Sequence, residues 1–247
     1  MRKIIQPCGF HCIKINNLGV SFGEQTVLED VNMHIHCGSF NVIIGQNGAG
    51  KSTLIKAILG EIPHTGTIEF KDTKDGHMAK LKIGYVPQKG VLLSGTIASN
   101  LRYGNQEATD EEVYAAARAV SADRVAAKLE QGYDTDVGEC GDKLSTGEKQ
   151  LISFARAVIA RPKIFVLDEA TSSVDTETEM LIQKATHTLM QGTTSFVIAH
   201  RLSTIRQADV ILVIDHGKIV EQGTHERLLK AGGAYAALYH TQLSRQE

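Results

Sequence analysis

The amino-acid sequence predicts an α/β fold: a mostly parallel sheet with an N-terminal antiparallel β subdomain and an inserted helical subdomain. Over much of the 247 residues, short apolar segments of strand-like composition alternate with segments of helical periodicity, as in parallel sheets covered by helices. A glycine-rich turn joins one apolar strand directly to a helix. The alanine-rich middle of the chain favours helix alone. The length corresponds to roughly one and a half ordinary domains, which fits a core with a smaller insertion.

Strand patterns dominate the first third of the chain. Residues 13–22 and 31–35 alternate apolar and polar side chains, which favours an antiparallel pair. Residues 40–44 form an apolar run typical of a buried strand, and a helix is expected over 52–59. Two further strands are expected at 67–70 and 82–86.

Helical patterns follow. Residues 110–129 predict one helix, for which Thr109 is the N-cap and Glu112 completes a capping box. A second helix is expected over 145–160, because Pro162 prevents its continuation. We expect the helical middle, 88–162, to be inserted into the sheet. The remaining elements are expected as strands at 163–167, 195–198 and 210–214, a helix at 177–190 and a helical flap at 226–243.

Composition narrows the function classes. The net charge of −2 gives no electrostatic support for a nucleic-acid partner. No apolar run approaches the ~20 residues of a transmembrane helix, and the first residues lack the apolar region of a secretory signal. We therefore expect a cytoplasmic chain, which is peripheral on the membrane face if it has a membrane partner.

The four cysteines are scattered and favour reduced thiols. Cys8 and Cys12, with His34 and His36, have a spacing faintly like that of a metal clip. The spacing lacks the second ligand pair of a zinc site, so an ordinary N-terminal strand is favoured.

A phosphate-binding motif lies between the strand at 40–44 and the following helix. Residues 45–52 read Gly-Gln-Asn-Gly-Ala-Gly-Lys-Ser and match G-x-x-x-x-G-K-[ST]. Glycines let backbone amides surround phosphate oxygens, Lys51 supplies a positive charge at the β- and γ-phosphates, and the Ser52 hydroxyl can ligate Mg²⁺. A chance glycine turn is the alternative, but placement between strand and helix argues against it. The expected nucleotide contacts are Gln46, Asn47, Gly48, Ala49, Gly50, Lys51, Ser52 and Thr53.

A second acidic motif follows the apolar strand at 163–167. Asp168 stands at the end of this strand, where it can hold Mg²⁺ through water. Glu169 comes next and is suited to polarising a water in line with the γ-phosphate. Acidic residues also simply end strands, but the P-loop upstream favours the catalytic interpretation.

The order of motifs resembles that of ATP-binding cassette (ABC) ATPases, which have a P-loop NTPase (RecA-like) core. The resemblance is carried by the P-loop, the segment Leu144-Ser-Thr-Gly-Glu148, the acidic strand, Ser172-Ser-Val-Asp175 and His200. It implies an ATP hydrolase that uses ATP and Mg²⁺. The segment 144–148 has Thr146 and Glu148 where the family most often has Gly and Gln, and both variants occur in the family.

The resemblance also implies residue roles. Ser145 and Gly147 would contact the γ-phosphate held by a partner domain, and Asp175 would lie at the dimer seam. Gln88 would contact Mg²⁺ or the attacking water and couple to transmembrane partners. Glu169 resembles the general base, His200 the switch residue on the γ-phosphate, and Phe22 the aromatic residue against adenine.

The implied partners are a second nucleotide-binding domain, identical or different, and a transmembrane transporter domain or subunit. Four functional segments follow: 1–87 with the β subdomain and P-loop, 88–162 with the helical signature subdomain, 163–225 with the rest of the core, and 226–247 as the flap. The alternatives are an ATP-binding module without productive turnover and a cassette ATPase that does not serve transport.

The two ends of the chain resemble different branches of the family. From Gln88 onward, segments such as Asn100-Leu-Arg-Tyr-Gly104 are similar to exporter cassettes. Earlier segments, such as Gly66-Thr-Ile-Glu-Phe70, resemble cassettes of metal-ion importers. The chain is therefore either a natural variant or a recombined chimera with a seam near Gln88.

Overall fold

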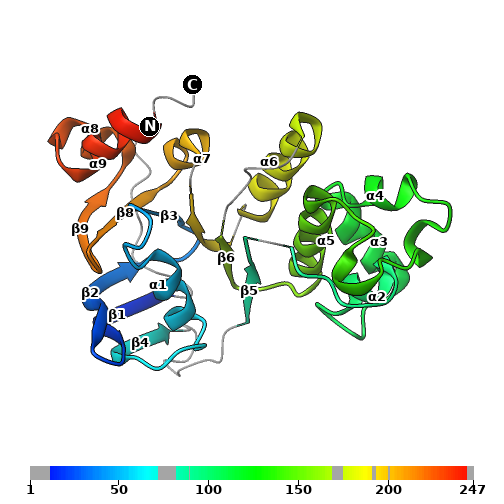
Figure 1. Cartoon of the computed structure of the whole chain (residues 1–247), viewed down its shortest axis with the longest axis horizontal. Coiled ribbons are helices and arrows are strands. Elements are labelled where there is room, and N and C mark those ends of the chain that lie inside the picture. The colour runs from blue at the N-terminus through cyan, green and yellow to red at the C-terminus, as the bar shows by residue number, and fades with distance from the viewer. Residues whose placement is uncertain are drawn as a thin grey trace. The chain divides into compact units, whose positions relative to one another are not determined.

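An antiparallel three-stranded sheet begins the part of the chain that the computed structural model describes, namely residues 12–71, 82–88, 90–168, 175–190, 193–199 and 201–243. Its strands β1 (Cys12–Phe22), β2 (Gln25–Ile35) and β4 (Thr65–Lys71) lie in the order β2-β1-β4 (Figure 1). A register shift between Ile15 and Leu18 moves the buried positions of β1 from odd to even numbers, so both residues face the core. The expected antiparallel pair is confirmed.

The chain divides into two compact units, residues 1–81 with 192–247 and residues 82–191. The first unit contains a sheet in the order β7-β3-β8-β9. Strands β7 (Thr194–Ile198), β3 (Phe40–Ile44) and β8 (Val210–Asp215) are parallel, and β9 (Lys218–Gly223) pairs antiparallel with β8. β3 and β7 are almost wholly buried, as central parallel strands are. Helix α1 (Lys51–Ile58) follows β3.

The C-terminal segment of this unit is helical, as expected, but interrupted. It consists of α8 (His225–Ala231), α9 (Ala234–Leu238) and a π-helical turn at Tyr239–Leu243. Gly232 ends α8 in the left-handed conformation, with φ 70°. A short helix α7 (Leu202–Arg206) precedes β8.

The second unit joins a parallel strand pair to a helical cluster (Figure 1). Strands β5 (Ile83–Val86) and β6 (Ile164–Asp168) pair in parallel. Helix α5 (Thr146–Ile159) packs against α2, α3 and α6 and buries Phe154 completely. The other helices are α2 (Ile97–Arg102), α3 (Asp110–Ala119), α4 (Asp123–Ala127) and α6 (Thr176–Met190), with 3-10 turns at Gly132–Asp134 and Glu139–Gly141.

The expectation of one helix over 110–129 was wrong. Its start is as predicted, because Thr109 and Glu112 form the capping box. The helix ends at Ala119 because Ser121 adopts φ 60°. The Ser121 amide then donates to the Arg118 carbonyl and the Ala122 amide to the Ala117 carbonyl, the bonding pattern of a Schellman cap. The remainder of the predicted helix is the separate α4.

The expected fold class is confirmed: parallel strands with helices, an antiparallel β subdomain and a helical subdomain. Within the described residues, every helix is too short or too polar to cross a membrane. Within the described residues, three named helices and strands lay outside the sequence expectations: α2, α7 and β9. Of these, α2 carries Asn100, which is described below.

Candidate nucleotide-binding site

The glycine-rich loop connects β3 to α1 in a conformation that only glycine supports at two positions. Gly45 and Gly50 have φ 155° and 105°. A Cβ on Gly45 would collide with the Ile214 carbonyl oxygen, and one on Gly50 would lie 2.7 Å from Leu28 Cδ2. The loop is therefore held directly against β8 and β2, with its backbone free of side chains at both contacts.

Lys51 begins α1 and is 8% exposed. Its ammonium donates to the carbonyl oxygens of Gly45 and Gln46, each at 2.8 Å, so the charge is held over the loop. The N-terminus of α1 adds amide donors and a partial positive charge at the same place. This combination of positive charge and loop backbone can hold a phosphate chain.

The other predicted nucleotide contacts of the first unit surround this loop in sequence. Gln46, Asn47, Gly48 and Ser52 are exposed, whereas Ala49 is buried and Thr53 half-buried. Phe22 lies at the end of β1, opposite Gln25 of β2, and is 54% exposed. More than half of Phe22 is therefore accessible to solvent, as stacking on a nucleotide base requires an accessible ring.

Of the predicted site residues in the second unit, the structure describes five. Asp168 is the half-buried last residue of β6, and Gln88 is exposed two residues after β5. Ser145 is exposed at the start of α5, and Gly147 is buried in its first turn. Asp175 is exposed directly before α6. Glu169 and His200 lie outside the described residues.

Ser145 is the N-cap of α5. Its hydroxyl accepts from the Glu148 amide at 3.3 Å, and the Glu148 carboxylate accepts from the Ser145 amide at 2.9 Å. This capping box satisfies two amides of the first turn and fixes the direction in which the helix begins. Ser145 thus stands at a positive helix end, a suitable place for an anion.

Asp175 has the same local role at α6. Its carboxylate accepts from the Thr178 amide at 2.9 Å. This hydrogen bond, together with one from the Thr178 side chain, holds the pKa of Asp175 below its usual range. The carboxylate is therefore charged at neutral pH at the positive end of the helix.

Sequence reasoning missed Arg156 and Asn100. The Arg156 guanidinium donates to the Asn100 side-chain and backbone oxygens at 2.8 and 3.0 Å, across 56 positions of sequence. The segment Asn100-Leu-Arg-Tyr-Gly104 contains a sequence signal that could have marked this pair. In the described part of the chain, no three His, Cys, Asp or Glu side chains are grouped to hold a metal. Cys8 of the metal-clip hypothesis lies outside the described residues.

A buried parallel strand, a glycine loop and a lysine at a helix start define a P-loop nucleotide-binding domain. The family model described as ABC transporter matches residues 28–172 of the chain. The chain therefore belongs to the ABC transporter family, whose ATP-binding domains are ATPases.

Relatives match the chain almost from end to end. The ABC transporter ATP-binding protein YknV of Bacillus subtilis is 45% identical over 97% of this chain and 42% of its own length. The ATP-dependent lipid A-core flippase of Syntrophus aciditrophicus is 42% identical over 95% of this chain and 40% of its own. The chain thus spans about two fifths of the length of these curated relatives.

A solved structure supports the fold. The structure of a bacterial Atm1-family ABC exporter with ATP bound matches with a TM-score of 0.86 and 36% identity, over 96% of this chain and 42% of that one. The alignment includes both sides of Gln88. The mixed origin of the chain stays a hypothesis, since an exporter accounts for the fold on both sides of the suggested seam.

Proposed function

We propose that this domain binds Mg·ATP, forms a head-to-tail dimer around two nucleotides, and hydrolyses ATP to ADP and phosphate to power transmembrane transport. The proposal is supported above all by the P-loop, in which Lys51 lies 2.8 Å from two loop carbonyls at the start of α1. The domain would act on the cytoplasmic side of the membrane, joined to a transmembrane domain or subunit. The four functional segments expected from the sequence divide these tasks.

The side chains of the first unit would bind the nucleotide. Lys51 and the loop amides, from Gln46 to Ser52 with Thr53, would neutralise and orient the phosphates. Phe22 would stack on the adenine through its exposed ring. The absence of side chains at Gly45 and Gly50 supports this fit, because a Cβ there would displace the loop.

Three residues from later in the sequence, Gln88, Glu169 and His200, would complete the reaction. Glu169 would accept a proton from the water that attacks the γ-phosphorus. The bond between this phosphorus and the oxygen that bridges the β- and γ-phosphates then breaks, and ADP leaves. His200 and Gln88 would orient the γ-phosphate and the water. The chemistry of the donor set fits Mg²⁺, since Ser52, Gln88 and Asp168 offer oxygens. When bound there, Mg²⁺ supplies positive charge against the β- and γ-phosphates.

Dimerisation would bring a second copy, or a related domain, over the bound ATP. Ser145 is exposed at the capped start of α5, so its hydroxyl and the helix end are accessible to a γ-phosphate held by the partner. Gly147 would allow close approach in the same turn, and Asp175 would lie at the seam. The lipid A-core flippase and the Atm1-family exporter motivate transport as the task, while the transported substrate stays open.

Two substitutions test the proposal. Glu169→Gln should retain ATP binding but lower steady-state hydrolysis at least about 10²-fold, the usual contribution of a general base. Lys51→Ala should weaken ATP binding about 10- to 100-fold, because it removes a charge-assisted hydrogen bond worth about 1.5–3 kcal/mol. Phosphate release and titration with labelled ATP measure the two effects.

The outcomes separate the rival functions. Wild-type ATP binding without turnover would identify a module without productive chemistry. Unchanged turnover in Glu169→Gln would refute the assigned base. Transport is supported if the chain copurifies with a membrane subunit or is continuous with a membrane domain. Neither is expected of a cassette ATPase that does not serve transport.

A further inference from the structure

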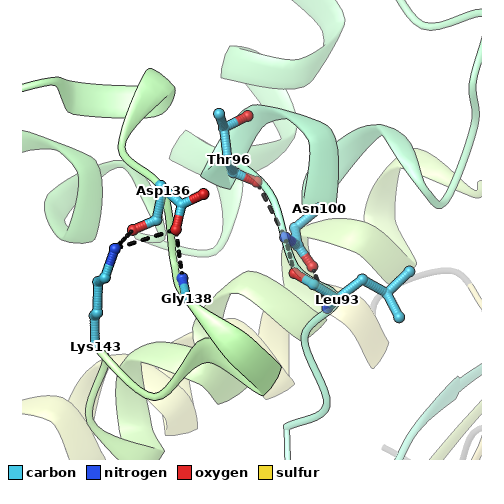
Figure 2. Close-up of polar contacts among 6 residues, drawn as sticks. All are labelled: Leu93, Thr96, Asn100, Asp136, Gly138 and Lys143. Carbon is cyan, nitrogen blue, oxygen red and sulfur yellow. Dashed lines mark hydrogen bonds and ion pairs between the residues drawn. The ribbon is translucent and has the colours of Figure 1, made fainter.

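Asn100 on α2 fixes the preceding loop from within the helical unit. It is 2% exposed. Its side-chain oxygen accepts from the Leu93 amide at 2.8 Å, and its side-chain nitrogen donates to the carbonyls of Leu93 at 2.8 Å and Thr96 at 3.0 Å (Figure 2). A buried amide that bonds both the donor and the acceptor of one residue defines the path of the backbone at that residue.

Arg156 extends this network from α2 to α5. Besides its two bonds to Asn100, its guanidinium donates to the Val91 carbonyl at 3.0 Å. The guanidinium carbon lies 5.5 Å from the centre of the Tyr103 ring. Burial lowers the pKa of Arg156, but an arginine stays charged at neutral pH. We name these two residues the Asn100–Arg156 node.

The fit around the node is close. A Cβ on Gly104, directly after Tyr103, would collide with the Arg156 carbonyl oxygen. A Cβ on Gly90 would lie 2.7 Å from the Lys149 carbonyl oxygen in the first half of α5. The backbone therefore touches α5 on both sides of the loop that Arg156 binds. Such contacts allow little displacement of this loop independent of α5.

The loop held by the node presents apolar side chains to solvent. Val91 is 55% and Leu93 46% exposed, whereas Leu92 between them is completely buried. Leu92 packs against the Gly141 backbone, where a Cβ would lie 2.9 Å from Leu92 Cδ1. The side chains that could meet a partner are thus attached to a backbone that is fixed from behind.

A second network connects the same loop to the residues before α5. The Val137 amide donates to the Gly95 carbonyl at 2.9 Å, and Thr96 forms a bridge with Asp136. The Asp136 carboxylate accepts from the Gly138 amide at 2.8 Å and from Lys143 at 3.1 Å, which keeps its pKa below the usual range (Figure 2). Lys143 lies two residues before Ser145.

We propose that Arg156 is a positioning residue, which fixes the loop 91–96 to α5 and thereby couples the position of Val91 and Leu93 to that of Ser145. Both ends of the coupling are on one helix, since Ser145 caps α5 and Arg156 lies in its last turn. A regular helix of this length transmits a displacement from one end to the other. The inference rests on the proposed function, in which Ser145 contacts ATP, and on the coupling of Gln88 to the membrane partner that the family resemblance implies.

The test is made with this chain assembled with the transmembrane domain or subunit of the proposed function, in lipid vesicles. Arg156→Gln removes the charge and disrupts the node, and Arg156→Lys keeps the charge with fewer hydrogen bonds. A misplacement of about 1 Å can cost on the order of 10²-fold in rate. We expect kcat to fall at least about tenfold in Arg156→Gln and less in Arg156→Lys, while KM for ATP stays within about twofold, because the Lys51 loop is unaltered.

The matched control is Arg161→Gln. Arg161 follows α5 and forms an exposed ion pair with Glu112 at 2.9 Å, so its loss also removes one arginine from this region. We expect its kcat to stay near that of the wild type. In Arg156→Gln, the Leu93 amide should exchange its hydrogen faster, whereas it should stay protected in Arg161→Gln.

Rates are compared per folded molecule, well below the unfolding temperature. If Arg156→Gln does not fold, Arg156→Lys tests the positioning role instead, and we expect its kcat to fall about threefold. Three results would overturn the positioning role. The variant of Arg156 could have the kcat of the wild type, its fall in kcat could be matched by Arg161→Gln, or its KM for ATP could rise together with the fall in kcat. A different result would contradict the proposed function itself: the wild type does not hydrolyse ATP, or Glu169→Gln hydrolyses it as fast as the wild type.

Discussion

Tyr235 is the most completely enclosed ionisable side chain of the C-terminal helices. It is 0% exposed, and its hydroxyl lies 2.5 Å from His225 Nδ1. Its amide donates to the Glu221 carboxylate on β9 at 2.7 Å. One residue therefore connects α8, α9 and β9. Burial raises the pKa of Tyr235 to about 12, because the phenolate would lose its hydration.

This shift predicts how stability depends on alkaline pH. The folded chain favours the neutral phenol, so the contribution of Tyr235 is complete below pH 10, the pKa of an unperturbed tyrosine, and is lost as the pH rises toward about 12. Tyr235→Phe should remove this part of the decline, at a cost of about 1 kcal/mol for the lost hydrogen bond. The free energy of unfolding, measured with denaturant between pH 8 and 11 (roughly the range in which the decline in stability begins), tests this prediction. The exposed Tyr103→Phe is the control, and an equal effect there would contradict the prediction.

Among single residues, Lys51 and Ser52 are proposed as phosphate and Mg²⁺ contacts because their motif is contiguous and its chemistry needs those side chains. Gly45 illustrates the limit of reasoning from a contiguous motif. The motif requires a glycine there for the phosphate, whereas the structure shows a second reason, the contact with the Ile214 carbonyl of β8. That reason depends on a strand about 170 positions away, counting from the two residue numbers. It cannot be read from the local sequence.

At the scale of elements, α5 combines a structural and a proposed chemical role at one residue. Ser145 caps the helix, and the same hydroxyl is proposed to meet the γ-phosphate. Substitutions that preserve a cap can separate the two roles, because Asp and Asn cap helices about as well as Ser.

We expect Ser145→Asp and Ser145→Asn to shift the unfolding midpoint by less than about 2 °C, and Ser145→Ala to lower it by about 2–4 °C, since a lost cap costs about 1 kcal/mol. Ser145→Asp should nevertheless lower hydrolysis at least about tenfold, because its charge opposes the γ-phosphate. Ser145→Asn, of the same size without the charge, should retain more activity. Calorimetry and phosphate release measure both effects, and equal activity of the two variants would refute the phosphate contact.

The elements that sequence reasoning missed have identifiable physical causes. β9 pairs with β8 through a turn in which His216 and Gly217 both have positive φ, a hairpin geometry for which glycine is the signal. Helix α2 is only six residues long, too short for periodicity to be recognised. The break between α3 and α4 depends on Ser121 in a left-handed conformation that serine rarely adopts, so propensity alone favoured one helix.

At the scale of the whole molecule, the predicted motifs are divided between two compact units. The P-loop and Phe22 belong to one, and Gln88, Ser145, Asp168 and Asp175 to the other. In the proposed function, ATP is held by the P-loop of one chain and contacted by Ser145 of a second domain. Nucleotide should therefore control association.

We expect the 247-residue chain with Glu169→Gln to sediment as a dimer with Mg·ATP and as a monomer with ADP. Hydrolysis would otherwise remove the γ-phosphate that holds the two copies together. Adding Ser145→Asp should restore the monomer in ATP. Analytical ultracentrifugation measures the mass, and a chain that stays monomeric under all conditions would favour a different partner domain over self-association.

The sequence by itself determined the features that arise within a few consecutive residues. These are the phosphate loop, the capping boxes at Thr109 and Ser145, the apolar strands and the end of α5 before Pro162, each fixed by local hydrogen bonding and periodicity. Tertiary structure alone decided which distant groups meet. Arg156 and Asn100 are 56 positions apart in the sequence, and their hydrogen bonds form only when α2 packs against α5 and excludes water from them. Local chemistry predicts a nucleotide site, but only packing could reveal how the exposed loop is fixed to the helix that begins at Ser145.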